Sequence, residues 1–120
     1  MKPTILVYSG CSTCRRAIAW LRAKEIEFIE RAIVDEPPTL AELSKWVPAS
    51  QLPYSKWLNT SGQSYRALGK AKVSAASHET LARWLSADGK LVKRPVLVHG
   101  QSVLVGFNEV AYEAHFAPRG

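Results

Sequence analysis

The sequence predicts an α/β fold around a mixed four-stranded sheet, and three observations support this. The apolar, β-branched run Thr4–Tyr8 is followed by an amphipathic stretch and a second apolar run, Glu27–Ile33, which is the order of a strand-helix-strand unit. Further along, the apolar runs Val96–Val98 and Val103–Gly106 flank a short loop that contains a glycine, as in a β-hairpin. The segment between the two units, about residues 38–88, has helical patterns and no strand pattern, so we expect a helical insertion there.

The strand-helix-strand unit is the first part of the predicted fold. Apolar residues recur at helical spacing after Cys14, and we expect a helix from Ser12 to about Lys24 with Ser12 or Thr13 as its N-cap. The two flanking strands should be parallel neighbours, because a right-handed crossover through a helix joins strands in that way.

The helical insertion begins after Asp35–Pro38, which stops the second strand. Thr39–Glu42 has the pattern of a capping box and predicts a helix to about Val47 that is ended by Pro48. Two short helical pieces and a further helix are expected after it: Pro53–Leu58, Ser64–Leu68 with Gly69 as its stop, and Ser77 to Asp88–Gly89.

The C-terminal part is predicted to consist of the hairpin and a last helix. Pro95 has no N–H to donate to a sheet, so it should stand at the first position of its strand, where a cis peptide bond is compatible. Arg94 is then held at the end of the sheet. We expect a four-residue turn at His99–Ser102 and a helix from Glu109 to about Phe116 that is capped by Asn108.

Length and composition suit a single domain covering residues 1–120. Hydrophobic residues make up 47% of the chain, which is ample for one core, and no run approaches the roughly twenty apolar residues of a membrane-spanning helix. We therefore expect no signal peptide and no contact with a membrane. Two cysteines in one local pair, without a scattered disulfide framework, favour a location in the reducing cytoplasm.

The formal net charge of +6 would suit nucleic acid, a small anion or an acidic protein surface, and charge alone does not distinguish these partners. Because most basic residues are dispersed, we favour a simple solvated surface and expect no direct, sequence-specific contact with nucleic acid. Two places are locally dense in charge, Lys90–Arg94 and Arg15–Arg16. If these two meet in space, they form a small anion site beside the cysteines.

Cys11 and Cys14 lie where the first strand gives way to the first helix, and this placement predicts redox chemistry. Helical neighbours three residues apart have Cβ atoms about 5–6 Å apart, whereas a disulfide requires roughly 3.5–4.5 Å. Cys11 must therefore lie just outside the helix. There the unpaired amides of the first turn, the helix dipole and the nearby Arg15 and Arg16 stabilise a thiolate. We expect Cys11 to be the nucleophile and Cys14 the resolving thiol of a redox disulfide.

Two alternatives to a redox pair are weighed against it. The thiols could be buried, inert packing residues, or they could form half of a zinc site. A zinc site needs two further thiols or imidazoles at short spacing. The chain has no third cysteine, and we expect His78, His99 and His115 to be far from each other and from the cysteines, so no metal site is predicted.

The loop Asn59–Gly62 is polar and turn-forming, and its side chains can donate and accept hydrogen bonds. It could cap the helical piece Ser64–Leu68 or face the cysteines. From the local pattern alone, we favour the capping role.

Three motifs of this chain stand out together: Cys11–Ala17, Asn59–Arg66, and Asp88–Gly89 with Lys93–Pro95 and Val105–Glu109. With these motifs the chain resembles the arsenate reductase-like (ArsC/Spx-type) family, whose members have a thioredoxin fold. The resemblance implies that the Arg94–Pro95 bond is cis and that Arg94 lies against the cysteine turn. It also implies that the Asn59–Gly62 loop approaches the same pocket, which favours a site role over capping.

The resemblance further implies a cytosolic thiol-disulfide oxidoreductase in which Cys11, Cys14 and Arg94 are catalytic. The resemblance also implies an oxyanion or disulfide substrate and no bound cofactor. The electron donor would be glutathione with glutaredoxin, or thioredoxin. The residues expected to bind the anion or substrate are Ser12, Thr13, Arg15, Asn59, Thr60, Ser61 and Pro95.

The chain also departs from the family's arsenate reductases, which typically have a serine at the position of Cys14 and bring two further arginines to the oxyanion. The matching positions here fall near Asn59 and near Gly106–Phe107, and neither holds an arginine. An oxyanion would lose two charge-assisted hydrogen bonds of about 1.5–3 kcal/mol each. Arsenate reduction is therefore disfavoured.

A second functional hypothesis follows from the same resemblance. Spx-type regulators also carry Cys-x-x-Cys, so the chain could be a redox-sensing regulator that binds the C-terminal domain of the RNA polymerase α subunit. A basic domain would favour an acidic partner. In either case we expect a monomer.

Overall fold

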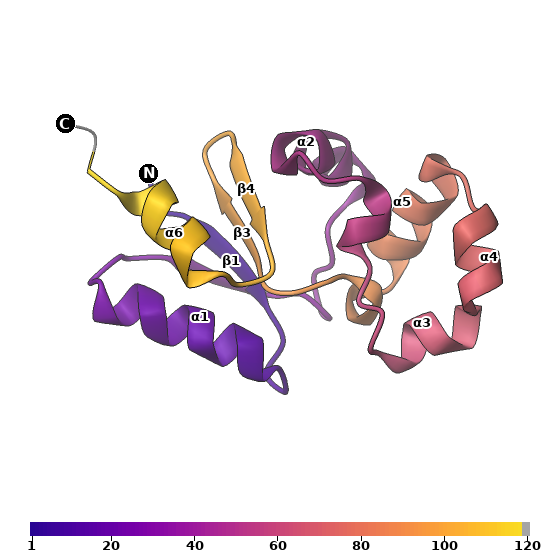
Figure 1. Cartoon of the computed structure of the whole chain (residues 1–120), viewed down its shortest axis with the longest axis horizontal. Helices are drawn as coiled ribbons and strands as arrows, with labels where there is room; N and C mark the ends of the chain where they lie inside the picture. The colour runs from indigo at the N-terminus through magenta and orange to yellow at the C-terminus, as the bar shows by residue number, and fades with distance from the viewer. Residues whose placement is uncertain (119–120) are drawn as a thin grey trace.

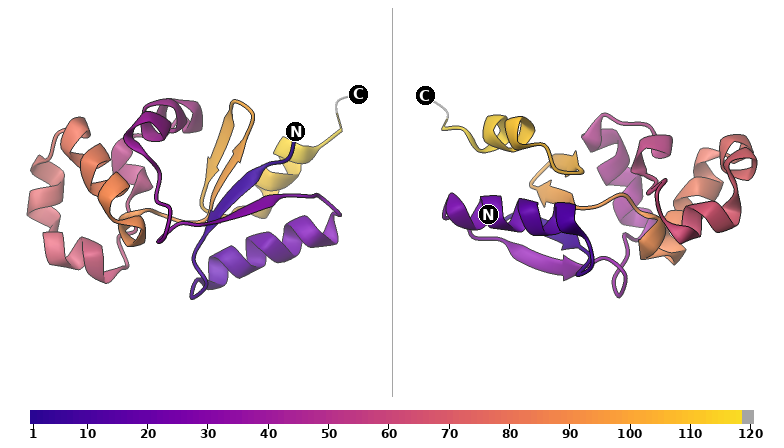
Figure 2. Two further views of the ribbon diagram at one scale, coloured as in Figure 1. Left: turned by 180° about the vertical axis from the view of Figure 1, so that it is seen from behind. Right: turned by 60° about the horizontal axis from the view of Figure 1, so that its bottom comes forward.

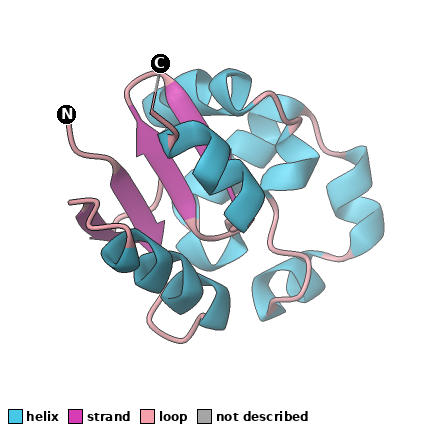
Figure 3. Ribbon diagram, turned by 60° about the vertical axis from the view of Figure 1, so that its left-hand side comes forward, coloured by secondary structure: helices cyan, strands magenta, loops and turns pink. Residues whose placement is uncertain are grey.

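The computed structural model describes residues 1–118 and contains a four-stranded sheet in the order β2-β1-β3-β4, with helices on both sides (Figures 1 and 3). β1 and β2 are parallel, whereas β1 with β3 and β3 with β4 are antiparallel. The predicted mixed four-stranded sheet is confirmed. None of the helices in residues 1–118 combines the length and apolar character needed to cross a membrane.

The strand-helix-strand unit consists of β1 (Thr4–Val7), α1 (Ser12–Ala23) and β2 (Ile29–Ala32). Both strands are shorter than the apolar runs that predicted them. β2 is an edge strand with three of its four residues exposed, and the chain leaves the sheet as soon as its partner β1 ends opposite Ala32. The parallel pairing of the two strands agrees with the prediction.

The hairpin is formed by β3 (Val96–His99) and β4 (Ser102–Val105), and α6 (Glu109–Phe116) follows it. Its turn has two residues and not the expected four, because His99 and Ser102 pair as strand residues. Gly100 adopts φ +62°, a conformation that a tight hairpin turn requires and that glycine reaches at no steric cost. Asn108 caps α6 as predicted, with its side-chain oxygen accepting from the N–H of Ala111 at 3.1 Å.

The segment between the two units is helical, as predicted. Its elements are α2 (Leu40–Ser50), the 3₁₀ turn η1 (Tyr54–Trp57), α3 (Gln63–Leu68), α4 (Lys70–Ala75), α5 (His78–Ala87) and the 3₁₀ turn η2 (Gly89–Leu91). α3, α4 and α5 lie at the opposite end of the molecule from α1 and α6, and α2 lies beside β4 (Figure 2).

Two expectations about this segment were wrong. Pro48 does not end α2, because it removes only one hydrogen bond near the end of the helix, and the helix continues to Ser50. Its C-cap is Gln51, in the left-handed conformation at φ 61°. The second error is α4, which the sequence did not reveal because it buries only Val73 and shows little apolar periodicity.

The alternating pattern of the strands builds two separate apolar clusters on the two faces of the sheet. Ile5 and Leu97 point to the face covered by α1 and α6, where Cys14 and Tyr112 are also buried. Leu6 and Val96 point to the other face, which packs against the helical segment. The side chains alternate because successive residues of a strand face opposite sides of the sheet.

Arg31 of β2 connects the sheet to the helical segment. Its guanidinium donates to both carboxylate oxygens of Glu42 in α2, each at 2.8 Å, and to the carbonyls of Glu36 and Pro37 at 2.9 Å. Glu42 also completes the predicted capping box of α2 with Thr39. The hydrogen bond from Arg31 outweighs the effect of burial and lowers the pKa of Glu42.

We predict that Glu42→Gln lowers the free energy of unfolding by about 1–2 kcal/mol at pH 7. Because the pKa of Glu42 is lower in the folded state, its contribution is present above the unfolded-state value of about 4.3 and is lost as the pH falls through the folded-state value. Urea denaturation of both proteins from pH 7 to 3 should show the difference shrinking on acidification. Glu79→Gln is the control, since its pair with Arg83 is exposed and should contribute under about 0.5 kcal/mol. An unchanged difference at pH 3 would contradict the assignment.

Candidate redox site at the first helix

Cys11 is itself the N-cap of α1, and this corrects the expectation that Ser12 or Thr13 caps the helix. Its backbone is extended, at φ −103° and ψ 114°, and its Sγ accepts a hydrogen bond from the N–H of Cys14 at 3.3 Å. A sulfur here takes the place of the serine or aspartate oxygen that usually binds the first-turn amides. The N–H of Cys11 in turn donates to the carbonyl of Tyr8 at 3.1 Å, which closes the turn between β1 and α1.

The two thiols differ in their surroundings. Cys11 is partly exposed, whereas Cys14 is only 1% exposed and belongs to the apolar cluster beneath α1 and α6. Only Cys11 can therefore be reached directly by a large substrate. Both cysteines are free thiols in the structure.

Arg94 approaches the same turn from the start of the hairpin. The Arg94–Pro95 peptide bond is cis, as the family resemblance implied. The guanidinium lies over the ring of Tyr8, with Cζ 4.7 Å from the ring centroid, and its Nη1 donates to the carbonyl of Lys90 at 3.3 Å. These contacts hold the positive charge beside Cys11.

These surroundings shift the pKa values of the two thiols in opposite directions. Burial raises the pKa of Cys11, but hydrogen bonds from the Cys14 thiol, the Cys14 amide and the Arg94 guanidinium, together with the charge of Arg94, lower it below the usual range. For Cys14, burial, the hydrogen bond that it donates to Cys11 and the negative charge of Cys11 raise the pKa to about 12. Cys11 is therefore the thiol of the pair that loses its proton first, and Cys14 keeps its proton to a higher pH.

The structure brings only some of the other predicted site residues to the cysteines. Asn59 joins Arg94 indirectly, because its Nδ2 donates to the same Lys90 carbonyl at 3.3 Å. Arg15 donates to the carbonyl of Ser9 at 3.1 Å, so it also lies at the turn. One arginine from each of the two charge-dense stretches, Arg15 and Arg94, therefore lies at this turn.

The remaining predicted residues have other surroundings. Ser12 is exposed and Thr13 partly exposed in the first turn of α1, and Pro95 is buried with its carbonyl accepting from Gly106 at 2.8 Å. Ser61 is exposed, and Thr60 lines a cavity inside the helical segment that includes neither cysteine.

A cavity of about 510 Å³ lies next to Cys14, between α1 and the edge strand β2. Its polar lining includes Ser9, Arg15, Glu30 and Asp35, so both signs of charge face it. Cys14 lines this cavity, whereas Cys11 and Arg94 do not.

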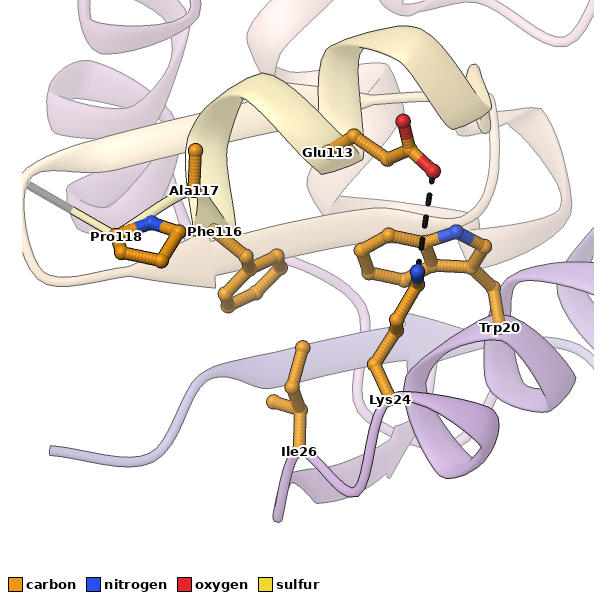
Figure 4. Close-up of a pocket in the computed structure, with 7 residues that line it drawn as sticks. All are labelled: Trp20, Lys24, Ile26, Glu113, Phe116, Ala117 and Pro118. Atoms are coloured by element: carbon orange, nitrogen blue, oxygen red, sulfur yellow. Dashed lines mark ion pairs between the residues drawn. The ribbon is translucent and has the colours of Figure 1, made fainter.

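A second hollow, of about 430 Å³, lies at the far end of α1, where α6 ends (Figure 4). It is lined by Trp20, Ile26 and Phe116, and the ammonium of Lys24 pairs with Glu113 across it at 4.0 Å. Neither cysteine lines it, so it is separate from the thiol chemistry.

The expectation that the three histidines are far from each other was wrong for His99 and His115. His99 Nδ1 and His115 Nε2 are 2.8 Å apart in a hydrogen bond, and His99 Nε2 donates to the Met1 carbonyl at 3.1 Å. Their meeting depends on the hairpin and α6, which sequence spacing does not show. Within residues 1–118 no three side chains of histidine, cysteine, aspartate or glutamate come together as a metal site would require.

Sequence reasoning missed two contributors to the site. Tyr8 lies under Arg94, and the backbone carbonyl of Lys90 orients both Arg94 and Asn59. Tyr8 could have been found from the sequence, because it is an aromatic residue just before the cysteine turn. No side-chain pattern could have revealed the second, because the group is a backbone carbonyl.

Comparison with known proteins supports a single family. The model of the ArsC family matches residues 6–115. YusI, an uncharacterised protein of Bacillus subtilis, is 38% identical over 118 residues, which cover 98% of this chain and 100% of YusI. The regulatory protein MgsR of the same organism is 31% identical over 88% of this chain and 82% of MgsR, and its global transcriptional regulator Spx is 27% identical over 88% and 80%.

Solved structures agree with the fold. An ArsC family related protein from Bacteroides fragilis is 43% identical, with a TM-score of 0.90 and coverage of 95% of this chain and 98% of that one. "A possible arsenate reductase" from Streptococcus mutans is 38% identical, with a TM-score of 0.86 and the same coverage. The predicted thioredoxin-like fold and the family resemblance are confirmed.

We predict that Arg94→Met raises the pKa of Cys11 and slows its alkylation at pH 7 several-fold, because a thiolate loses a hydrogen bond and a nearby positive charge. The rate of reaction with iodoacetamide, measured from pH 5 to 10 in a Cys14→Ser background, gives the ionisation directly. The sequence suggested that Arg16 also stabilises the thiolate, but Arg16 is exposed on α1 and is not among the groups that lower the pKa of Cys11, so Arg16→Met is the matched control. Equal effects of the two substitutions would show that Arg94 has no specific role.

Proposed function

This chain belongs to the ArsC family, and from that membership we propose that it is a thiol-disulfide oxidoreductase with Cys11 as nucleophile and Cys14 as resolving thiol. The observation that carries the proposal is the contrast between the two sulfurs. Cys11 is accessible and has a lowered pKa, whereas Cys14 is buried three residues away and has a raised one. An enzyme that resolves its own mixed disulfide needs these two environments.

The reaction with a disulfide proceeds in two exchanges. The Cys11 thiolate attacks one sulfur of the substrate, forms a mixed disulfide and releases the other substrate sulfur as a thiolate. Cys14 then loses its proton and attacks the Cys11 sulfur, which forms the Cys11–Cys14 disulfide and releases the second substrate thiolate. The substrate gains two electrons, and the protein loses them until a dithiol donor reduces it. We propose glutathione with glutaredoxin, or thioredoxin, as that donor in the cytoplasm.

Arg94 would hold the negative charge of the substrate and of the Cys11 thiolate, because a guanidinium offers a planar set of donors. The positions that match the further arginines of arsenate reductases do not add positive charge here. Asn59 is turned to the Lys90 carbonyl, and the Phe107 ring packs against Tyr112 with centroids 4.8 Å apart. A disulfide substrate therefore fits this site better than arsenate does.

A second candidate function is redox-dependent regulation of transcription. The observation that favours it is the identity of 31% with the regulatory protein MgsR and of 27% with Spx, each over 88% of this chain. In this case the Cys11–Cys14 disulfide would change how the domain binds the C-terminal domain of the RNA polymerase α subunit. The chain is basic, which suits an acidic partner surface.

We predict that Cys11→Ser abolishes reduction of a disulfide substrate and that Cys14→Ser stops after the first exchange. A coupled assay of NADPH consumption with the thioredoxin or glutaredoxin system, using arsenate and several disulfides, measures turnover. Mass spectrometry of the Cys14→Ser protein should show the substrate thiol attached to Cys11. The proposal fails if neither substitution changes any reductase activity.

The regulatory alternative predicts that the polymerase domain is captured by one redox state of this chain more strongly than by the other. A pull-down with dithiol and disulfide forms measures this, and the double Cys11→Ser, Cys14→Ser variant is the control that cannot switch. Absence of binding in both states would remove the support for this function.

A further inference from the structure

The helical segment contains a cavity of about 280 Å³ that the proposed chemistry does not use. Its walls come from η1, the loop that follows it, α3, α4 and the beginning of α5. Gly69 joins α3 to α4 at φ +88°, a conformation that favours glycine, and α4 continues in a different direction (Figure 1). Because α3 buries no residue and α4 buries only Val73, these two short helices leave the space between them and α5 unfilled.

The inner wall of this cavity is apolar. Leu58, Val73 and Leu81 line it, and none of them is more than 7% exposed. All three belong to the apolar cluster on the helical side of the sheet, so their positions are fixed by the core. A ligand that fills the cavity must therefore place an apolar group against them.

The rest of the lining is polar and contains no carboxylate. Six side chains with hydroxyl or nitrogen groups line the cavity: Ser55, Thr60, Tyr65, Lys70, Ser74 and His78. Within residues 1–118, none of these six forms a hydrogen bond or an ion pair with another part of the chain. Their polar groups face the solvent of the cavity and are available to a ligand.

Lys70 gives the cavity its positive charge. Its ammonium has three donors and no acceptor, and the hydroxyl groups around it can donate as well. His78 adds an imidazole whose ring lies against Tyr54, with centroids 5.3 Å apart. Hydrogen bonds from such donors are strongest to an acceptor that is itself charged, so this lining suits an anionic group.

We propose that this cavity binds a small organic anion. Its carboxylate or phosphate group would contact Lys70 and the hydroxyls, and its apolar body would pack against Leu58, Val73 and Leu81. A volume of about 280 Å³ lies at the lower end of small-molecule sites, which are roughly 300–1,000 Å³, so the occupant has a single ring or a short chain. The site is independent of the proposed redox function, because neither cysteine lines it.

Four benzene derivatives that differ in their polar group test the proposal: phenyl phosphate, benzoate, benzyl alcohol and benzylammonium. Their binding to the full chain is measured from the shifts of backbone amide signals in ¹H–¹⁵N spectra. At least one of the two anions should bind about tenfold or more tightly than benzyl alcohol, because a charge-assisted hydrogen bond has an effect of this size. Benzylammonium should bind most weakly, and the largest shifts should be those of Leu58, Thr60 and Ser74. The tighter of the two anions identifies the head group.

Two substitutions test the named contacts. Lys70→Met keeps an exposed side chain of similar length, so it should weaken binding of the tighter anion about tenfold and leave benzyl alcohol unaffected. Lys72→Met is the matched control, because Lys72 is exposed on the same helix, lies 5.6 Å from the Trp84 ring and does not line the cavity. Thr60→Val removes one hydroxyl without a change of shape and should weaken the anion several-fold. Thermal unfolding of each variant checks that it is folded.

Three results would overturn the proposal. The first is that neither anion binds more tightly than benzyl alcohol. The second is that the shifts concentrate at Cys11 and Arg94, which would assign the anion to the redox site. The third is equal weakening by Lys70→Met and Lys72→Met, which would show attraction by the basic surface as a whole. All three would leave the oxidoreductase proposal intact, since its own test concerns the cysteines.

Discussion

The hydrogen bond between the Cys14 amide and the Cys11 sulfur is the interaction on which the rest of the site depends. It makes a cysteine the N-cap of α1, so the reactive atom replaces the oxygen that normally binds the end of a helix. The same bond places Cys11 at the positive end of the helix dipole, where it is partly buried at the margin of the apolar cluster. Cys14, one turn into the helix, is inside that cluster. This local contact is one cause of the lowered pKa of Cys11, and the burial of Cys14 is the largest cause of its raised pKa.

The rest of the fold brings charge to that contact. Arg94 is far from Cys11 in the sequence, and the sheet brings them together because β3 pairs with β1 directly before the cysteine turn. The helical segment then orients Arg94 through the Lys90 carbonyl, which also binds Asn59. The bidentate pair of Arg31 with Glu42 connects this segment to the edge strand. The helical segment is therefore part of the site's support, although its own cavities contain no cysteine.

Much of the fold could be predicted from local signals. The capping box at Thr39–Glu42, the cap at Asn108 and the β-branched runs act within a few residues, so the sequence displays them directly. What could not be predicted depends on contacts between distant parts of the chain. The hydrogen bond between His99 and His115 and the Lys90 carbonyl that Arg94 and Asn59 share exist only once the sheet has formed. The capping role of Cys11 was missed because serine and threonine follow it immediately and are the commoner caps.

The central claim is that this fold makes Cys11 the acidic thiol of the pair. The direct measurement is a pH titration of the reduced protein in which the ¹³Cβ chemical shifts of Cys11 and Cys14 are followed separately. The account predicts that Cys11 titrates below the value of about 8.5 of free cysteine and that Cys14 remains protonated until far higher pH. A Cys11 that titrates like free cysteine, or a Cys14 that titrates first, would contradict it.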